Sequence, residues 1–365
     1  MGKRIVFGGL LAFLAACGGS VEDPAPVSTP LPAAPSPPAA EQGIYQPPTT
    51  KGPDHVADGL GSPSALAMTS DRVLFTTRSA TAGGQQIAAG ALYVADKRVG
   101  PARMIALDRR GASFDALTVD ATTAFVATSD ARIVSIPVVG GAMKTVVQLA
   151  ASAVALAVSG EYLYFATTAG AIGRIAKKDG NVAALATIPG TISGLQADEA
   201  GVYVATGASE EVAAGIQRVA FDGTVTSLTA GAEPCAMIRD GHNLYWTSLA
   251  PSAAPNASAK GEVRRISLES GAAATVASGS FSACAIAADA TSLYFATSYP
   301  AAQPVKAGGS VDGAAGLGLM RTPIAGGEPV AVAQATRALT QPGAVAVDAT
   351  HVYWLTETAV LRLPK

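Results

Sequence analysis

The chain has 365 residues, a formal net charge of -2 and only 14% charged residues, so it lacks the broad positive field that holds nucleic acid. Because 49% of its residues are hydrophobic, it is not disordered throughout. Its 3 cysteines and 3 histidines offer neither a disulfide-built scaffold nor a histidine-rich metal site.

The first segment, residues 1–16, has the features of an export signal. Lys3 and Arg4 precede a charge-free run, Ile5–Ala16. That run is too short to cross a bilayer and has the length of a signal-peptide core. We therefore expect an exported protein.

The end of this run resembles the signal of bacterial lipoproteins. Leu14, Ala15 and Ala16 stand before Cys17. The resemblance implies that Cys17 is acylated and becomes the first residue, so that acyl chains anchor the protein to a membrane. Gly18, rather than an aspartate, follows, which implies delivery to the outer membrane of a Gram-negative bacterium. The alternative is an ordinary secretory signal with an incidental cysteine.

The next segment, residues 17–50, starts at this cysteine and alternates proline with alanine, serine and threonine between Pro24 and Pro48. Proline fixes φ and lacks an N–H group, so neither a helix nor a central strand is compatible with this segment. We expect a disordered, polyproline-like tether that holds the folded part away from the membrane. A proline-rich ligand for a partner is the alternative.

The remainder, residues 51–365, repeats one motif. Its most regular element is an apolar and aromatic run that ends in threonine or serine and is typical of a strand. The run occurs as VLFTT from Val73, AFVAT from Ala124, LYFAT from Leu163, VYVAT from Val202, LYWTS from Leu244, LYFAT from Leu293 and VYWLT from Val352. Most copies follow another apolar run that closes with a polar residue, and precede a third and a fourth run separated by a glycine turn.

Four antiparallel strands that recur in this way are typical of the blade of a β-propeller. One blade has two apolar faces, and blades stacked around an axis bury both. The last copy has only three strands, and His55–Asp58 resembles the missing fourth. We therefore predict an all-β, seven-bladed β-propeller of four-stranded antiparallel blades over residues 51–365, closed by this N-terminal strand. A parallel β-helix is the alternative architecture.

Two copies resemble known propeller families. Asp240 followed by LYWT from Leu244, and Asp348 followed by VYW from Val352, are similar to YWTD propellers of the low-density-lipoprotein-receptor type and to NHL-type propellers. The resemblance covers about residues 55–365 and implies the fold. No copy has the full Tyr-Trp-Thr-Asp string and the copies number seven rather than six, so it implies little about function.

Two of the cysteines occupy the same position in the repeat. Cys235 and Cys284 each lie five residues before the aspartate of their copy, on the expected innermost strands of adjacent blades. Inner strands crowd near the axis, where Cα atoms come close enough for a disulfide, and an exported protein meets an oxidising compartment. We predict a Cys235–Cys284 disulfide; two buried free thiols are the alternative.

The sequence predicts no catalytic, cofactor-binding or metal site. It has no H-E-x-x-H, G-x-S-x-G or phosphate-loop motif. His242 and His351 fall in hairpins of different blades, and His55 falls in the closing strand. The repeated aspartates are expected to be turn residues, one per blade: Asp120, Asp198, Asp240, Asp289 and Asp348. The repeated arginines of the third strands are expected to form a solvated face: Arg174, Arg218, Arg265, Arg321 and Arg362.

The connections between the second and third strands vary in length. They open on one face of a propeller, together with the loops that join blades, and we call this the loop face. The longer ones are Ser79–Ala89, Ser209–Ala214, Leu249–Lys260 and Ser298–Gly316. Loops on a rigid scaffold often carry function, so we expect the loop face to bind a partner. Drift in exposed loops is the alternative.

We therefore predict a monomeric, non-catalytic binding or scaffold protein of the cell envelope, held at the membrane by acyl chains on Cys17. Its expected partner is an envelope protein, a peptide or a glycan, and not nucleic acid. Two alternatives stay open. One is a propeller enzyme of the lyase or lactone-hydrolase type with a metal in the axial channel, and the other is a purely structural spacer of the envelope.

Overall fold

The computed structural model describes eight stretches of the chain: 53–82, 85–97, 101–231, 233–249, 261–279, 281–299, 316–334 and 344–365. The predicted signal peptide, Cys17 and the predicted tether lie outside these stretches. Of the two units into which the chain divides, Met1–Gln46 and Pro47–Lys365, the second contains every strand below. Within the described stretches, no helix is long and apolar enough to cross a membrane.

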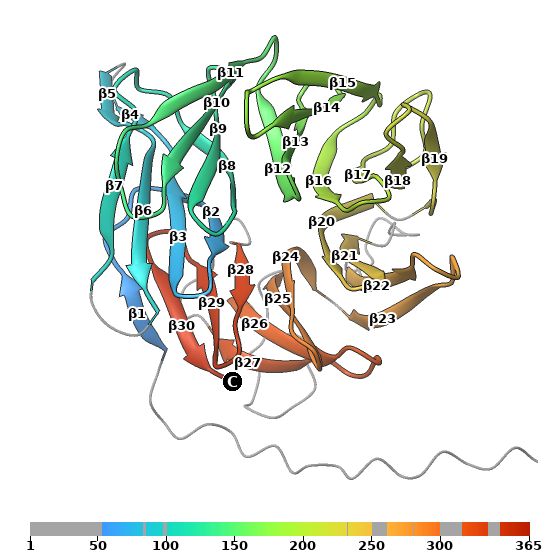
Figure 1. Ribbon diagram of the computed structural model, residues 1–365. Helices are drawn as coiled ribbons and strands as arrows, with labels where there is room; N and C mark the ends of the chain where they lie inside the picture. Colours follow the sequence, from blue (N-terminus) through green and yellow to red (C-terminus); the bar gives the residue numbers. More distant parts are fainter. Residues whose placement is uncertain are drawn as a thin grey trace, which may run out of the picture. The chain divides into compact units, whose positions relative to one another are not determined.

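The strands form seven four-stranded antiparallel sheets, which stand as blades around a common axis (Figure 1). From the innermost strand outward, blades 1 to 4 are β2 (Pro63–Met68), β3 (Arg72–Thr77), β6 (Ala91–Asp96) and β7 (Arg103–Leu107); β8 (Phe114–Val119), β9 (Thr123–Thr128), β10 (Arg132–Pro137) and β11 (Lys144–Gln148); β12 (Ala153–Ser159), β13 (Tyr162–Thr167), β14 (Ala171–Ala176) and β15 (Val182–Thr187); and β16 (Ile192–Ala197), β17 (Val202–Thr206), β18 (Gly215–Val219) and β19 (Val225–Ser227). Blades 5 to 7 are β20 (Glu233–Asp240), β21 (Asn243–Leu249), β22 (Gly261–Ser267) and β23 (Ala273–Gly279); β24 (Ser282–Ala288), β25 (Ser292–Tyr299), β26 (Gly316–Pro323) and β27 (Val330–Gln334); and β28 (Val345–Val347), β29 (His351–Leu355), β30 (Val360–Pro364) and β1 (Asp54–Ala57). The all-β, seven-bladed prediction is confirmed.

The predicted closure is also confirmed. β1 pairs with β30 in antiparallel register, with Asp54 opposite Arg362 and His55 opposite Leu361. Figure 1 shows β1 (blue) lying beside β30 (red). The strand nearest the N-terminus therefore supplies the outermost position of the last blade, one residue earlier than the predicted His55–Asp58.

The hydrophobic core is divided among the seams between blades. Leu74, Phe114 and Val126 belong to the cluster between blades 1 and 2, and Phe75 and Val360 to the cluster between blades 7 and 1. Each of the other five seams has a cluster of its own. Aromatic and branched residues of the second strands thus fill the space that two neighbouring blades share, because neither blade buries both of its faces alone.

The repeated arginines do not form the solvated face expected from the sequence. Each is half-buried and lies opposite the tyrosine of the second strand in its own blade. The pairs are Tyr164 with Arg174, Tyr203 with Arg218, Tyr245 with Arg265, Tyr294 with Arg321, and Tyr353 with Arg362. At the corresponding positions blade 1 has Leu74 opposite Val94, and blade 2 has Phe125 opposite Ser135. The tyrosine and the arginine are therefore present together or absent together. The long arginine stem covers apolar surface that a seam would otherwise expose.

Candidate functional site at the seam between blades 1 and 2

The described part of the loop face is most complete over blades 1 to 4. In blade 1 the predicted long connection, Ser79–Ala89, contains a hairpin of β4 (Ala80–Ala82) and β5 (Gln85–Ala88). In blade 4 residues 207–214 link β17 to β18. The predicted loops Leu249–Lys260 and Ser298–Gly316 lie almost wholly outside the described residues.

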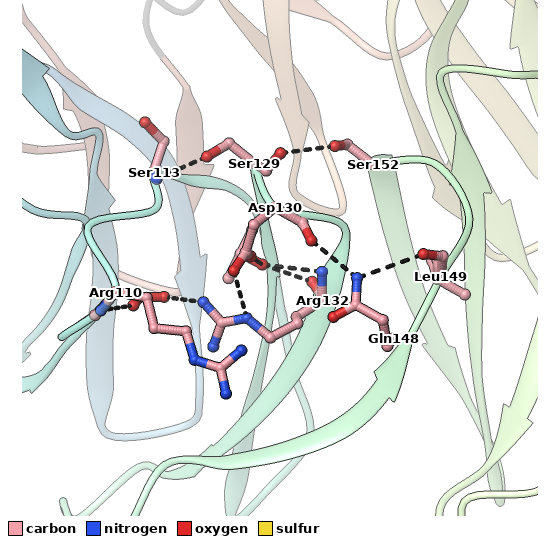
Figure 2. Close-up of polar contacts among 10 residues, drawn as sticks. Arg110, Ser113, Ser129, Asp130, Arg132, Gln148, Leu149 and Ser152 are labelled. Atoms are coloured by element: carbon pink, nitrogen blue, oxygen red, sulfur yellow. Dashed lines mark hydrogen bonds and ion pairs between the residues drawn. The ribbon is translucent and has the colours of Figure 1, made fainter.

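A chain of serines joins the loops of blades 1 to 3. The Ser79 hydroxyl lies 2.7 Å from the Ser113 hydroxyl, and the Ser113 N–H donates to the Ser129 hydroxyl at 3.0 Å. The Ser152 hydroxyl donates to the Ser129 carbonyl at 3.0 Å, as Figure 2 shows. Four separate connections are thereby held at fixed positions on the loop face.

Beside this chain, a buried ion pair crosses the seam between blades 1 and 2. Arg132, the first residue of β10, donates from a terminal nitrogen to Asp108 Oδ2 at 2.5 Å. Its Nε donates to Asp130 Oδ2 at 2.7 Å (Figure 2). The side chains of Arg132 and Asp108 are 3% and 0% exposed. The other oxygen of Asp108 accepts the Arg110 N–H at 2.7 Å, which fixes the loop that leaves β7.

Asp130 and Arg132 each stabilise the charged form of the other. Burial raises the pKa of the Asp130 carboxyl, but hydrogen bonds from Arg132 and Thr128 outweigh burial and leave that pKa lowered. Burial lowers the pKa of the Arg132 guanidinium, but its bonds to Asp130 and Asp108 leave that pKa raised. Both groups stay charged at neutral pH, so they brace the seam and are poorly suited to proton transfer.

A groove of about 630 Å³ opens next to the ion pair, along β7. Met104 and Leu107 of β7 line it and are 51% and 45% exposed. Arg109 and Arg110, both exposed, line it where β7 enters the loop face, and Met143 of blade 2 lines it on the facing side. No side-chain partner for Arg109 or Arg110 occurs among the described residues. The groove thus combines apolar surface with unneutralised positive charge.

The predicted disulfide is present. Cys235 on β20 and Cys284 on β24 are bonded, and their Cα atoms are 4.9 Å apart. Both strands are innermost, in blades 5 and 6. The disulfide is remote in the ring from the groove and belongs to the scaffold.

The repeated aspartates act as turn residues, as the sequence indicates. Asp348 Oδ1 accepts the N–H groups of Thr350 and His351, both at 2.8 Å. Asp120, Asp198 and Asp289 make equivalent pairs of contacts. Asp240 differs, because it is the last residue of β20 and lies opposite Asn243. One aspartate per blade forms no carboxylate cluster.

A second role of these aspartates was not predicted. In three seams, the lysine that follows the third strand of the next blade reaches the other carboxylate oxygen, Oδ2, of this aspartate. Lys177 donates to Asp120 at 3.1 Å, and Lys365 to Asp289 at 2.6 Å. Lys97 lies 3.4 Å from Asp348. These pairs link neighbouring blades on the face opposite the loop face.

The histidines make separate local contacts. His55 contacts Asp58 at 2.5 Å, His242 lies 3.4 Å from Glu269, and His351 contacts the Thr350 hydroxyl. In the part of the chain that the structure describes, no three His, Cys, Asp or Glu residues gather in a way that would hold a metal ion.

The groove residues were missed by sequence reasoning. The repeat analysis compares corresponding positions, and Asp108, Arg109 and Arg110 stand in a connection between blades where no copies correspond. The local density of charge could have identified them, because three consecutive charged residues are unusual in a chain in which only 14% of residues are charged.

Comparison with known proteins shows the fold. No protein-family model matches the sequence, and no curated protein matches it. A chain of the mitotic checkpoint complex superimposes with a TM-score of 0.62 at 11% identity, over 88% of this chain and 97% of that one. YCF48 bound to D1 peptide gives 0.58 at 10% identity, over 88% and 96%. An oligogalacturonate lyase in complex with manganese gives 0.57 at 11% identity, over 85% and 90%. The protein is thus a seven-bladed β-propeller, and at these identities the likeness concerns the fold alone.

Proposed function

We propose that this protein is a non-catalytic binding or scaffold protein of the bacterial cell envelope, and that it engages its partner where the groove along β7 opens on the loop face. The observation that carries the proposal is the groove along β7. Its apolar surface and its arginines without partners among the described residues are features of a recognition site. The charged groups beneath it are engaged with one another, so the groove binds rather than reacts.

The proposed location rests on the beginning of the chain and on the disulfide. Residues 1–16 supply an export signal, and Cys17 is the proposed site of acylation at the outer membrane. The Cys235–Cys284 disulfide supports export, because such bonds persist in oxidising compartments. If Cys17 is acylated, its replacement by serine moves the protein from the membrane fraction to the soluble fraction.

The proposed partner is a protein or a peptide. An exposed outermost strand with apolar and charged side chains suits a polypeptide, which can satisfy both backbone and side-chain groups. Among the propellers of similar fold, YCF48 is bound to a peptide, and another lies within a checkpoint complex. In those two neighbours a propeller of similar fold carries or joins a polypeptide, which supports a polypeptide partner here.

Site-specific photo-crosslinking in intact cells tests the proposal. A photoreactive residue at Leu107, in the groove, is expected to give a discrete set of larger adducts. The same residue at Val330, which is 42% exposed on the outer strand of blade 6, is the matched control. Equal adducts at both positions, or none at Leu107, would contradict a binding role for this groove.

A further inference from the structure

We infer that the groove along β7 binds an extended, acidic segment of a partner protein, which lies beside β7 as an additional strand. This inference rests on the proposed function and names the chemistry of the partner. Three independent properties of the groove point to it: its backbone edge, its charge and its apolar surface.

The backbone edge favours an extended segment. β7 is the outermost strand of blade 1 and pairs only with β6 in its sheet. Five consecutive residues, Met104–Asp108, line the groove. A β-bulge at Ile105 breaks the alternation of side chains in β7, and the groove follows the strand from Met104 to its end at Leu107. An open edge is a template for one more strand.

The charge favours an acidic partner. Three arginines line the groove, and its one carboxylate belongs to Asp108, which already binds Arg132. The side chains of Arg109 and Arg110 remain, at the end of the groove that opens on the loop face. Arginine binds carboxylates through two parallel hydrogen bonds, so this pair is suited to aspartate or glutamate side chains. The whole chain has a net charge of -2, so this local positive charge is not a general property of the surface.

The apolar surface of the groove favours a partner segment in which apolar residues alternate with acidic ones. Met104 and Leu107 are among the few exposed large apolar residues, and Val139 of the neighbouring turn in blade 2 is a third. The Arg103 side chain donates to the Val139 carbonyl at 2.9 Å, which holds that turn against β7. An added strand would place its apolar side chains against this surface and its carboxylates toward the arginines. A second copy of this chain is disfavoured as the occupant, because its own β7 presents the same positive charge.

Selection from a library of random dodecapeptides displayed on phage tests the inference with the full chain in detergent micelles. We expect the selected peptides to be enriched in aspartate and glutamate alternating with apolar residues. The affinity of a selected peptide should fall at least tenfold in Arg109→Glu and in Arg110→Glu. It should change less than twofold in Lys178→Glu, an exposed charge reversal in blade 3. A peptide whose acidic residues are replaced by arginine should regain affinity for Arg109→Glu.

Three outcomes would overturn the inference. These are selected peptides without acidic residues, equal affinity for Arg109→Glu and Lys178→Glu, or no enrichment above micelles alone. If non-acidic peptides are selected while crosslinking at Leu107 succeeds, the inference fails and the proposed function stands. If neither experiment gives binding, both fail.

Discussion

In three blades a single carboxylate ties its hairpin to itself and to the neighbouring blade, and Asp348 shows the chemistry most fully. Its Oδ2 accepts the Tyr353 hydroxyl at 3.2 Å and faces Lys97. Burial raises the pKa of Asp348, but the N–H groups of Thr350 and His351 and the charge of Lys97 outweigh burial and hold that pKa at about 2. Burial, followed by the charge of Asp348, raises the pKa of Tyr353 to about 12.

These two groups limit stability at opposite ends of the pH scale. The contribution of Asp348 is complete above pH 3.8 and is lost as the pH falls toward about 2. The contribution of Tyr353 is complete below pH 10.0 and is lost as the pH rises toward about 12. We expect Asp348→Asn to lower the free energy of unfolding by roughly 1–2 kcal/mol at pH 7. At pH 2 the variant and the wild-type protein should differ less in their free energy of unfolding.

Urea unfolding across this pH range measures the effect. Asp179→Asn is the control, because Asp179 caps an exposed turn by accepting the Asn181 N–H at 3.0 Å. A loss at pH 7 that is the same in both variants would show that the cluster around Asp348 contributes nothing beyond its turn.

The bond between Cys235 and Cys284 is expected to be detectable by counting thiols. Reduction of the unfolded protein should reveal two more alkylatable thiols than the non-reduced protein has. The bond closes a loop with a sequence separation of 49 residues. Replacing both cysteines by serine should therefore lower the free energy of unfolding by about 3–4 kcal/mol, as denaturant titration would show. An unchanged count of alkylated thiols on reduction would refute the bond.

Between elements, the innermost strands are tied to one another at one level of the repeat. Ser64 donates to the Phe114 carbonyl at 2.7 Å in the next blade, and Ser193 donates to the Pro234 carbonyl at 2.6 Å. Cys235 and Cys284 occupy the corresponding position on β20 and β24. The disulfide is thus the covalent counterpart of a hydrogen bond that other seams make with serine.

The closing strand β1 is expected to stabilise the last blade. Deleting residues 53–58 removes the ladder with β30 and the contacts of Val56 and Ala57 with the cluster between blades 7 and 1. We expect a loss of about 2–4 kcal/mol in the free energy of unfolding. Amide hydrogen exchange should accelerate in β30, whose open edge should also promote self-association.

A deletion of equal length within residues 17–50 is the control and is expected to leave exchange in β30 unchanged. If exchange in Val360–Pro364 stays at the wild-type rate after removal of 53–58, β1 does not stabilise the last blade.

Over the whole molecule, the architecture was predictable from the sequence because it repeats. The groove was not predictable, because it occurs in one seam and has no counterpart in the other copies. Comparing copies with one another predicted the strands, the turns and the disulfide, which the structure confirms. The same comparison assigned Arg174 and its counterparts to solvent, although each lies opposite a tyrosine, because a strand's repeat position alone does not show how much a neighbouring blade covers. The ion pair of Arg132 with Asp108 forms where two blades meet, and a comparison of repeat copies does not show which residues of adjacent blades come together.

The proposed class of protein makes a prediction about metals. A binding protein without a metal site should contain Ca, Mg, Mn and Zn only far below one ion per chain after purification. Its melting temperature should stay unchanged after dialysis against EDTA. Stoichiometric metal, together with destabilisation by EDTA, would favour the alternative of an axial metal enzyme.

The place of β1 has a mechanical consequence. This short strand has one sheet neighbour, β30, and follows directly on the chain that precedes Pro53. Tension applied through that preceding chain is transmitted to the rest of the ring first across the β1–β30 ladder. The pairing of β1 with β30 is therefore expected to break first under load. Its rupture force sets the largest pulling force that the closed ring withstands.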